Sequence, residues 1–323
     1  MSFRYRVATV FGGAGFIGRH LVQRLARTGT IVRVATRNTS RANFLRTNGT
    51  VGQIVPVPVN TADDASVAAA VGGADFVINL IGILHEARKN TFASAQAELP
   101  GRLGRAARAA GALRVVHVSA IGADAASPSA YARSKAEGEA ALLDAFPEAT
   151  ILRPSVVFGP EDGFFNRFAS MASIMPVLPL IGGGRTRFQP VYVGDVADAI
   201  MAVLNDPATR GRLYELGGPR VYTMREVMEL VLRETRRRRP LVTVPWRLAE
   251  VLGRVMGVLP NPPLTADQVE LLKRDNVVSA DAATLRDLGI TPTAAEVILP
   301  TYFDRFRIGG RFADQRSTGG VTH

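Results

Sequence analysis

An apolar, β-branched run over residues 7–11 leads directly into the turn Gly12-Gly13-Ala14-Gly15-Phe16-Ile17-Gly18. The residues after this turn repeat apolar side chains at helical spacing, so the pattern is typical of a strand, a glycine turn and a helix in succession. In such a turn Gly12 allows the sharp bend, Gly15 lets the backbone approach a pyrophosphate, and Gly18 lets the helix pack closely. Free N–H groups at the start of the helix would bind the phosphates. We therefore interpret residues 12–18 as a dinucleotide site, rather than as a glycine turn that binds nothing.

The residues that follow the second expected strand, residues 30–36, bear on which dinucleotide is bound. A site that prefers NAD places an Asp or Glu there to bind the ribose hydroxyls. This chain instead has Arg37, Asn38 and Arg41, without an acidic residue between them. Arg37 can pair with a 2′-phosphate and Arg41 can assist it, so we expect NADP(H) in preference to NAD(H).

Strand and helix patterns alternate along the first half of the chain. Further strands are expected at residues 54–59, 75–79 and 113–119, and helices at residues 62–71 and 92–110. This alternation predicts an α/β fold with a doubly wound parallel sheet. We expect a Rossmann domain over residues 1–160, to which part of 185–210 returns, a smaller C-terminal α/β domain over 161–308, and a flexible tail over 309–323.

Two further segments are expected to border the cofactor. Leu80, Ile81 and Gly82 follow the fourth strand, at the edge of the sheet where the dinucleotide binds. Pro154 lies where a later strand runs into a loop that would pass the nicotinamide.

Composition excludes several classes of site. The chain of 323 residues contains no Cys, and its four His are scattered, so we expect neither a disulfide nor a metal site. The first strand begins too early to leave room for a signal or transit peptide, and no run of residues is long and apolar enough to span a membrane. The net charge of +11 favours an acidic partner or an anionic membrane surface over nucleic acid, because no nucleic-acid-binding motif accompanies it.

Ser119 and the pair Tyr131 and Lys135 form a candidate catalytic group. Tyr131 and Lys135 are four residues apart, so on a helix they share a face. Lys135 would bind the nicotinamide ribose and lower the pKa of Tyr131, which would act as the acid/base for a carbonyl or hydroxyl while Ser119 orients it. The alternative is that the three residues only hold the ribose, without turnover.

Two basic segments lie in the C-terminal half. Arg236 to Arg239 follow an expected helix, where they would complement the helix dipole or contact lipid headgroups or an acidic subunit. Residues 245–256 predict a second helix, with Arg247, Glu250 and Arg254 on one face. The other face carries Trp246, Ala249, Leu252, Val255 and Met256. This helix either lies at a membrane interface or packs onto the domain core.

Most of the chain, residues 5 to 305, resembles one family. The resemblance rests on the segments Ile78-Asn79-Leu80-Ile81-Gly82, His117-Val118-Ser119, Tyr131-x-Arg133-x-Lys135-Ala136-x-Gly138-Glu139, 144–149, 158–171 and 189–196. These segments are similar to the NADPH-binding accessory subunit of respiratory complex I (NADH:ubiquinone oxidoreductase), an atypical short-chain dehydrogenase.

The resemblance implies a tightly bound NADP(H) with a structural role, held by Gly12, Gly15, Gly18, Arg37, Tyr131 and Lys135. It also implies that the other complex I subunits are partners, and that the chain is peripheral on the membrane near the quinone site. For a bacterial, α-proteobacterial form this is the cytoplasmic face of the inner membrane. The complete Ser119, Tyr131 and Lys135 set keeps open a free oxidoreductase or epimerase. Ser119 precedes Tyr131 by only twelve residues, however, which is short for an epimerase. A redox-sensing binding protein on the same fold is a third hypothesis.

Overall fold

The computed structural model describes residues 6–86, 90–257, 259, 262–308 and 310. The expected flexible tail therefore lies outside the described residues, apart from Gly310. The chain forms two compact units, the first made of Met1–Pro154, Val193–Leu216 and Val278–Thr291, and the second of Ser155–Tyr192, Gly217–Val277 and Pro292–His323.

The first unit is built on a seven-stranded sheet in the order β11-β6-β5-β4-β1-β2-β3. Every strand pair in it is parallel. The strands are β1 (Val7–Phe11), β2 (Ile31–Thr36), β3 (Ile54–Pro58), β4 (Phe76–Asn79), β5 (Arg114–Val118), β6 (Thr150–Pro154) and β11 (Leu213–Leu216). The order reverses between β1 and β4, which is the switch point of a doubly wound sheet. The predicted α/β fold is confirmed.

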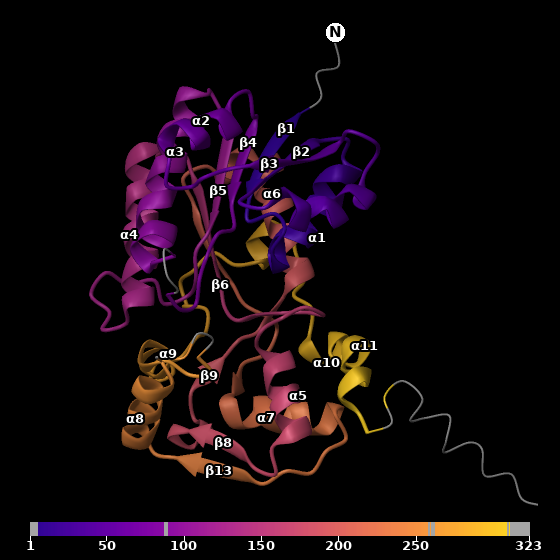
Figure 1. Ribbon diagram of the computed structural model, residues 1–323, viewed down its shortest axis with the longest axis vertical. Coiled ribbons are helices and arrows are strands. Elements are labelled where there is room, and N and C mark those ends of the chain that lie inside the picture. Colours follow the sequence, from indigo (N-terminus) through magenta and orange to yellow (C-terminus); the bar gives the residue numbers. More distant parts are fainter. Residues whose placement is uncertain (1–5, 87–89, 258, 260–261, 309, 311–323) are drawn as a thin grey trace, which may run out of the picture. The chain divides into compact units, whose positions relative to one another are not determined.

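Helices cover both faces of this sheet (Figure 1). They are α1 (Phe16–Arg27), η1 (Thr39–Asn48), α2 (Asp64–Val71), the π-helix η2 (Ala93–Glu98), α3 (Leu99–Ala109), α4 (Ala130–Ala145), α6 (Val193–Asn205), η4 (Pro207–Thr209) and η5 (Arg286–Leu288). Helices α2, α3 and α4 pack on one face, over a core that includes Phe11, Leu103 and Leu142. Helices α1 and α6 contact each other on the opposite face.

Local sequence explains where the first elements begin and end. Strand β1 is buried from Ala8 to Phe11, which matches its unbroken apolar sequence. Helix α1 buries Leu21, Val22 and Leu25, one stripe at helical spacing. Helix α4 begins where the side chain of Ser129 accepts a hydrogen bond from the N–H of Ala132.

Neither edge of the sheet is a fully open strand. Strand β3 carries Pro56 and Pro58. The N–H of Val59 donates to Thr36 O, toward β2. Successive N–H groups along a strand point in opposite directions, so the positions of Pro56 and Pro58 are those whose N–H would point away from the sheet. At the other edge, Glu215 N donates to Ala283 O at 2.8 Å. This bond lays part of 278–291 along β11, so that segment lies in the first unit, whereas the sequence analysis placed it with the smaller domain.

The second unit combines helices with pairs of short strands. The strand pairs are β7 (Val157–Phe158) with β10 (Val191–Tyr192), β8 (Leu178–Ile181) with β13 (Leu241–Val244), and β9 (Arg187–Phe188) with β12 (Tyr222–Thr223). The helices are α5 (Phe165–Ile174), η3 (Gly182–Gly184), α7 (Met224–Glu234), α8 (Trp246–Met256), α9 (Ala266–Leu271), α10 (Ala295–Ile298), α11 (Pro300–Phe303) and η6 (Asp304–Phe306). Their core includes Phe158, Phe165 and Phe303.

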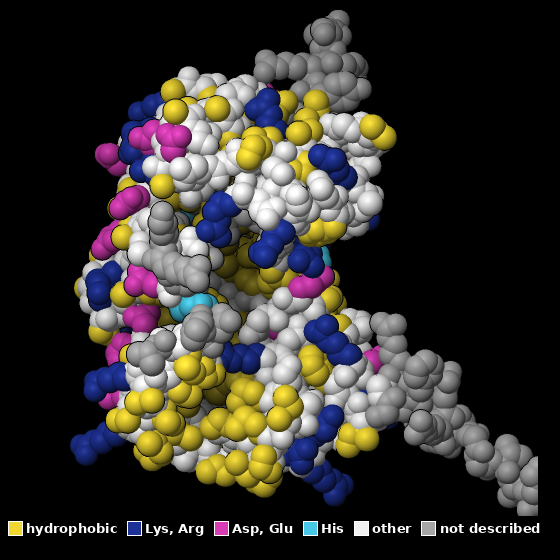
Figure 2. Space-filling model, viewed as in Figure 1, with side chains coloured by type: hydrophobic (Ala, Val, Ile, Leu, Met, Phe, Trp, Pro, Cys, Tyr) yellow, Lys and Arg dark blue, Asp and Glu magenta, His cyan; other side chains and the backbone are white. Residues whose placement is uncertain are grey.

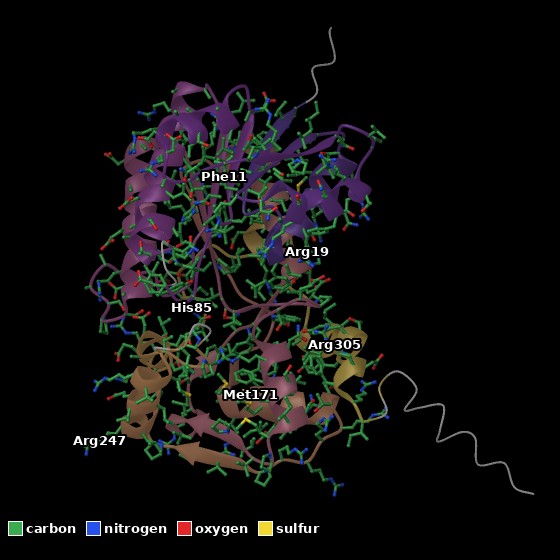
Figure 3. All side chains as sticks on the ribbon, in the orientation of Figure 1. Phe11, Arg19, His85, Met171, Arg247 and Arg305 are labelled. Atoms are coloured by element: carbon green, nitrogen blue, oxygen red, sulfur yellow. The ribbon has the colours of Figure 1, made fainter. Side chains whose placement is uncertain are left out.

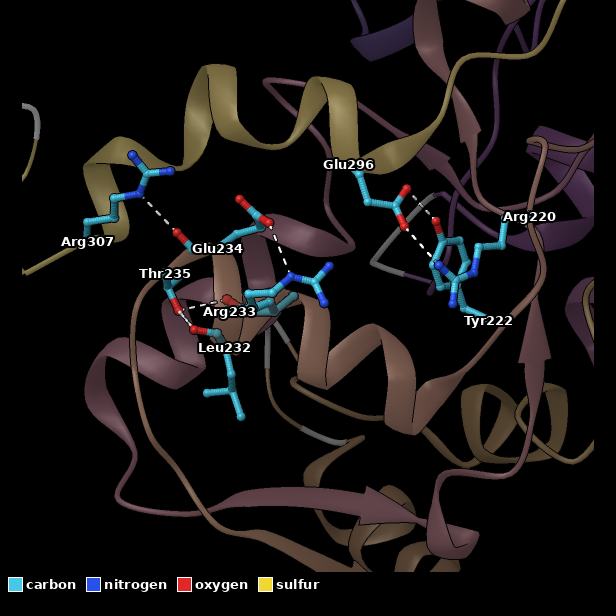
Figure 4. Close-up of polar contacts among 9 residues, drawn as sticks. Arg220, Tyr222, Leu232, Arg233, Glu234, Thr235, Glu296 and Arg307 are labelled. Atoms are coloured by element: carbon cyan, nitrogen blue, oxygen red, sulfur yellow. Dashed lines mark hydrogen bonds and ion pairs between the residues drawn. The ribbon is translucent and has the colours of Figure 1, made fainter.

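Polar contacts attach the last helices of the second unit to α7 and β12 (Figure 4). Tyr222 donates its hydroxyl to Glu296 Oε2 at 2.7 Å, and burial and this carboxylate raise the pKa of the tyrosine. Arg307 Nε donates to the carbonyl oxygen of Glu234 at 3.0 Å. These bonds satisfy polar groups that the packing removes from water.

Helix α6 begins at Val193 and buries Asp195 in its first turn. Over the described residues, the structure contains no helix with the length and hydrophobicity needed to cross a bilayer.

Candidate functional site

The glycine turn between β1 and α1 has the geometry that its sequence predicts. Gly12 adopts a φ of +79°, and a Cβ there would stand 3.1 Å from the backbone carbon of Leu80. Gly15 N donates to Gly12 O at 2.9 Å, which closes the turn. A Cβ on Gly18 would stand 2.5 Å from Gly13 Cα, closer than real Cβ contacts. The first turn of α1 therefore packs against the glycine loop itself.

The N-terminus of α1 is left without a side-chain cap. Its N-cap is Gly15, and none of its first-turn residues is acidic. The first N–H groups of a helix have no partner within the helix, and the helix dipole adds positive potential there. A phosphate at this position would complete their hydrogen bonds.

The residues expected to select the cofactor lie at the end of β2. Arg37 is exposed and donates through Nη1 to Asn90 Oδ1 at 2.7 Å, while Asn38 caps η1 by accepting from the N–H of Arg41 at 3.3 Å. Sequence analysis missed a third arginine, Arg19 in the first turn of α1 (labelled in Figure 3), whose guanidinium lies 5.3 Å from the centre of the Phe44 ring. Its position directly after Gly18 was the signal available.

The structure brings together the candidate catalytic residues at the end of β5. Lys135 Nζ donates to Val118 O, next to Ser119, at 3.4 Å, and it lies 6.0 Å from the centre of the Tyr131 ring. The Tyr131 ring also packs edge-on against Phe92. Ser119 Oγ is buried and has no hydrogen-bond partner within the described part of the chain. A buried hydroxyl of this kind calls for a ligand or water.

Burial changes the protonation of two groups in this cluster. It lowers the pKa of Lys135 to about 8, against a smaller opposing effect of the Glu139 carboxylate. It also lowers the pKa of His117 to about 3, and the charge of Lys135 adds to this shift. His117 is therefore neutral, and its Nδ1 lies 3.1 Å from Asn79 Nδ2. Because the Asn79 oxygen accepts from Ile81 N, the amide nitrogen donates, and the imidazole proton is on Nε2.

The loop after β4 approaches the same lysine. A Cβ on Gly82 would stand 3.3 Å from Lys135 Nζ. Gln96, which the sequence analysis did not single out, holds this loop: its Nε2 donates to Ile83 O at 2.5 Å, and its Oε1 accepts from Ser134 Oγ at 3.2 Å. Its position in a π-helix is of a type often found at functional sites.

The remaining expected residues lie on the same unit. Pro154 ends β6, and its carbonyl oxygen accepts from Ile121 N at 3.0 Å. The structure thus gathers the glycine turn, the loop after β4 and the ends of β5 and β6 in one unit. The part of the chain that the structure describes contains no group of three or more His, Cys, Asp or Glu placed to hold a metal ion.

Fold and site together define a Rossmann-type protein built to bind a nicotinamide dinucleotide. The uncapped α1 N-terminus, the glycine cradle and the buried Ser119 hydroxyl all fit such a ligand. The solved structure of a quinone oxidoreductase from Escherichia coli, described as NADPH-dependent and complexed with NADPH, is 19% identical, has a TM-score of 0.72 and covers 91% of this chain and 99% of its own. This likeness shows the fold.

Sequence comparison identifies the family. Residues 8–217 match the NAD dependent epimerase/dehydratase family. Subunit 9 of the NADH dehydrogenase [ubiquinone] 1 alpha subcomplex, a mitochondrial protein of Arabidopsis thaliana, is 39% identical over 94% of this chain and 79% of its own length. A ceramide reductase of Caulobacter vibrioides is 33% identical over 69% of this chain and 68% of its own. The chain belongs to the NAD dependent epimerase/dehydratase family and, within it, to the family of that NADH dehydrogenase subunit.

Helix α8 presents an unusual surface in the second unit. Of its residues it buries only Ala249 and Gly253. Leu248, Val251 and Val255 are 50%, 53% and 64% exposed. Hydrophobic side chains gather in the region of α8, β8 and β13 (Figure 2), and Arg247 points outward (Figure 3). Several apolar side chains of this helix are thus not packed within the described residues of its unit.

Two members of the Arg236 to Arg239 run make contacts within the second unit. Arg237 Nε donates to Phe306 O at 3.0 Å, and Arg239 Nε donates to Ala172 O at 3.1 Å. Arg238 is exposed. These two arginines therefore help to hold the fold, so the run as a whole is not a free basic patch.

Proposed function

We propose that the chain is an accessory subunit of respiratory NADH:ubiquinone oxidoreductase, holding NADP(H) as a structural ligand. The observation that carries this proposal is its membership of the subunit family, 39% identical over 94% of this chain, together with the glycine cradle. In this reading the first unit is stabilised by the dinucleotide, and the subunit binds other members of the complex. The subunit is peripheral on the membrane, and in a bacterium it lies on the cytoplasmic face.

The dinucleotide in this proposal is NADP(H) rather than NAD(H). No acid directly follows β2, and in this proposal Arg37 and Arg41 bind the 2′-phosphate. Arg19 adds a third cation at the start of α1. The glycine turn and α1 would hold the pyrophosphate, and Lys135, Tyr131 and Ser119 the nicotinamide ribose.

The membrane contact is assigned to α8. Its exposed apolar face carries Leu248, Val251 and Val255, with Trp246 at its beginning and Arg247 and Arg254 beside them. An amphipathic helix with these residue types lies in the interface of a bilayer, with its apolar face toward the acyl chains.

A second candidate function is an NADP-dependent oxidoreductase. It is favoured by the Ser119, Tyr131 and Lys135 group, because burial lowers the pKa of Lys135 to about 8 and leaves Ser119 Oγ without a partner among the described residues. With a dinucleotide bound to supply or accept hydride, Tyr131 would donate or take the proton at the substrate oxygen while Lys135 stabilises its phenolate.

The first experiment separates the two. Membranes from the source organism are solubilised in mild detergent, complexes are separated on a native gel stained for NADH dehydrogenase activity, and this chain is located by mass spectrometry. The proposal expects the chain in the active high-mass band, with one NADP(H) per chain on extraction. Migration of the chain alone, with turnover that is lost in Tyr131→Phe, would establish the oxidoreductase instead.

A further inference from the structure

A cavity of about 660 Å³ in the second unit is lined by none of the residues assigned to the dinucleotide. Its wall combines the loop Gly182-Gly183-Gly184, Arg185 after that loop, Arg225 in the first turn of α7, Thr243 of β13, and Trp246. All of these lie in one unit, so the cavity belongs to that unit alone.

Three consecutive glycines give the cavity its shape. Gly182, Gly183 and Gly184 have φ values of +59°, +75° and +70°, a left-handed conformation that residues with a side chain rarely adopt. A Cβ on Gly182 would overlap the indole ring of Trp246. A Cβ on Gly184 would stand 3.1 Å from Arg225 N. Glycine therefore allows both Trp246 and the start of α7 to approach the loop.

The polar side chains that line the cavity are rich in donors. The guanidinium groups of Arg185 and Arg225, the indole N–H of Trp246 and the hydroxyl of Thr243 have no hydrogen-bond or ion-pair partner among the described residues. No Asp or Glu lines the wall. Glu226, which follows Arg225, directs its carboxylate to the N–H and hydroxyl of Thr223 at 2.7 and 2.9 Å. Two arginines without a carboxylate partner suit an anion with several oxygens, such as phosphate.

The cavity lies at the beginning of α8. Pro245 and Trp246 line it, and Trp246 is also the first residue of α8. Along that helix Leu248, Val251 and Val255 are exposed. A free phosphate would use the donors and leave the apolar face uncovered. A ligand that carries both a phosphate and long hydrocarbon chains would use both.

We propose that this cavity binds the phosphate headgroup of an anionic phospholipid whose acyl chains lie against α8. The inference rests on the membrane contact in the proposed function, and it makes that contact specific for a lipid class. Arg185 and Arg225 bind the phosphate oxygens, the Trp246 indole N–H donates at the headgroup level, and α8 lies in the interfacial plane. The net charge of +11 favours the same anionic surface.

The test uses the full chain and its single tryptophan, which lines the cavity. Binding is measured by co-sedimentation and by Trp246 fluorescence, on phosphatidylcholine vesicles with and without phosphatidylglycerol. The anionic vesicles contain about 30 mol% phosphatidylglycerol, which gives a marked negative surface potential. The variant is Arg185→Gln/Arg225→Gln. The matched control is Arg105→Gln/Arg108→Gln, which removes the same charge from exposed positions on α3 of the first unit. Circular dichroism melting verifies that both variants are folded.

The expected result is a preference of the wild-type chain for anionic vesicles that falls about tenfold in Arg185→Gln/Arg225→Gln and at most about twofold in the control. Binding to neutral vesicles stays unchanged in both. Equal losses in the two variants would overturn the cavity assignment while leaving the membrane contact standing. Failure of the wild-type chain to bind either vesicle would instead overturn the membrane contact itself.

A soluble-phosphate arm identifies the source of the anion. Glycerol 3-phosphate and inorganic phosphate are titrated against the same Trp246 signal, with dihexanoyl phosphatidylglycerol as the short-chain lipid. The lipid is expected to act at concentrations at least about tenfold lower, because only it buries apolar surface against α8. Equal potency of glycerol 3-phosphate would assign the cavity to a soluble phosphate compound and overturn the lipid.

Discussion

Arg153 and Glu139 form a two-point ion pair that joins strand β6 to helix α4. Arg153 Nε donates to Glu139 Oε1 at 2.9 Å, and Nη2 donates to Oε2 at 2.5 Å. Glu139 is four residues after Lys135, so both lie on one face of α4. The arginine compensates a buried carboxylate that would otherwise interact with the lysine alone. This pair, outside the expected cofactor contacts, helps to set the charge beside Lys135.

Removal of this arginine should destabilise the first unit. Arg153→Met leaves the Glu139 carboxylate, 7% exposed, without its main partner, and the neighbouring Glu215 at 3.9 Å loses the same cation. We expect the free energy of unfolding to fall by about 3 kcal/mol, measured by urea denaturation of the cofactor-free protein. Arg233→Met, which removes an exposed arginine paired at 3.6 Å with the partly buried Glu234, should cost less than about 1 kcal/mol. Equal losses of unfolding free energy in the two variants would contradict the role of Arg153 as the partner of a buried carboxylate.

The lowered pKa of Lys135 predicts a dependence of stability on alkaline pH. Its pKa falls from 10.5 when exposed to about 8 in the fold, so between these values the unfolded chain binds more protons. Stability therefore rises as pH increases through this window. In Lys135→Met this contribution is absent, so the wild-type chain should gain about 2 to 3 kcal/mol relative to the variant between about pH 7 and pH 10. A constant difference in urea denaturation would refute the shift.

Gly18 should tolerate no side chain. In Gly18→Ala the new Cβ meets the backbone of Gly13 at 2.5 Å and must displace the glycine turn. We expect the bound dinucleotide to be lost on purification and the melting temperature to fall by about 5 °C or more. Gly163→Ala is the matched control, because a Cβ there meets nothing within 4 Å. Full dinucleotide occupancy in Gly18→Ala would show that the turn does not hold the pyrophosphate.

Arg37 should discriminate between the two nicotinamide dinucleotides. A charge-assisted contact with a 2′-phosphate is worth about 1.5 to 3 kcal/mol, so Arg37→Ala should weaken NADP(H) binding about tenfold to a hundredfold and leave NAD(H) binding unchanged. Titration calorimetry measures both affinities. Arg46→Ala, at an exposed position in η1, is the charge-matched control. Parallel losses for NADP(H) and NAD(H) would remove Arg37 from the phosphate site.

Local physics made the first half of the fold predictable. Within about twenty residues, the sequence predicts a strand from the apolar run before Gly12, then the glycine turn, then a helix from the spacing of apolar residues. Sequence patterns are informative over such a length. The parallel sheet follows from the repeated alternation of strands and helices. The reason offered for Gly12, a sharp turn, is visible in its φ of +79°.

Contacts between distant residues were not predictable in this way. Strand β8 is a short element in a segment rich in Pro and Gly, and it exists because Leu178–Ile181 pair with β13, about sixty residues later. Gln96 holds the loop after β4 only because the fold brings it to Ile83 and Ser134. Likewise, residues 278–291 lie in the first unit because part of this segment pairs with β11. The periodicity of α8 showed two faces, but it could not show that Leu248 and Val251 would be left exposed.

The two modified edges of the main sheet bear on how this chain behaves before it finds its partners. A parallel sheet with open edges invites a second chain to add a strand, which is a route to aggregation. Here Pro56 and Pro58 remove two outward donors on β3, and the segment through Ala283 occupies part of the rim at β11. Both edges therefore disfavour the addition of a strand from another chain, and associations of this chain are directed to surfaces made by side chains.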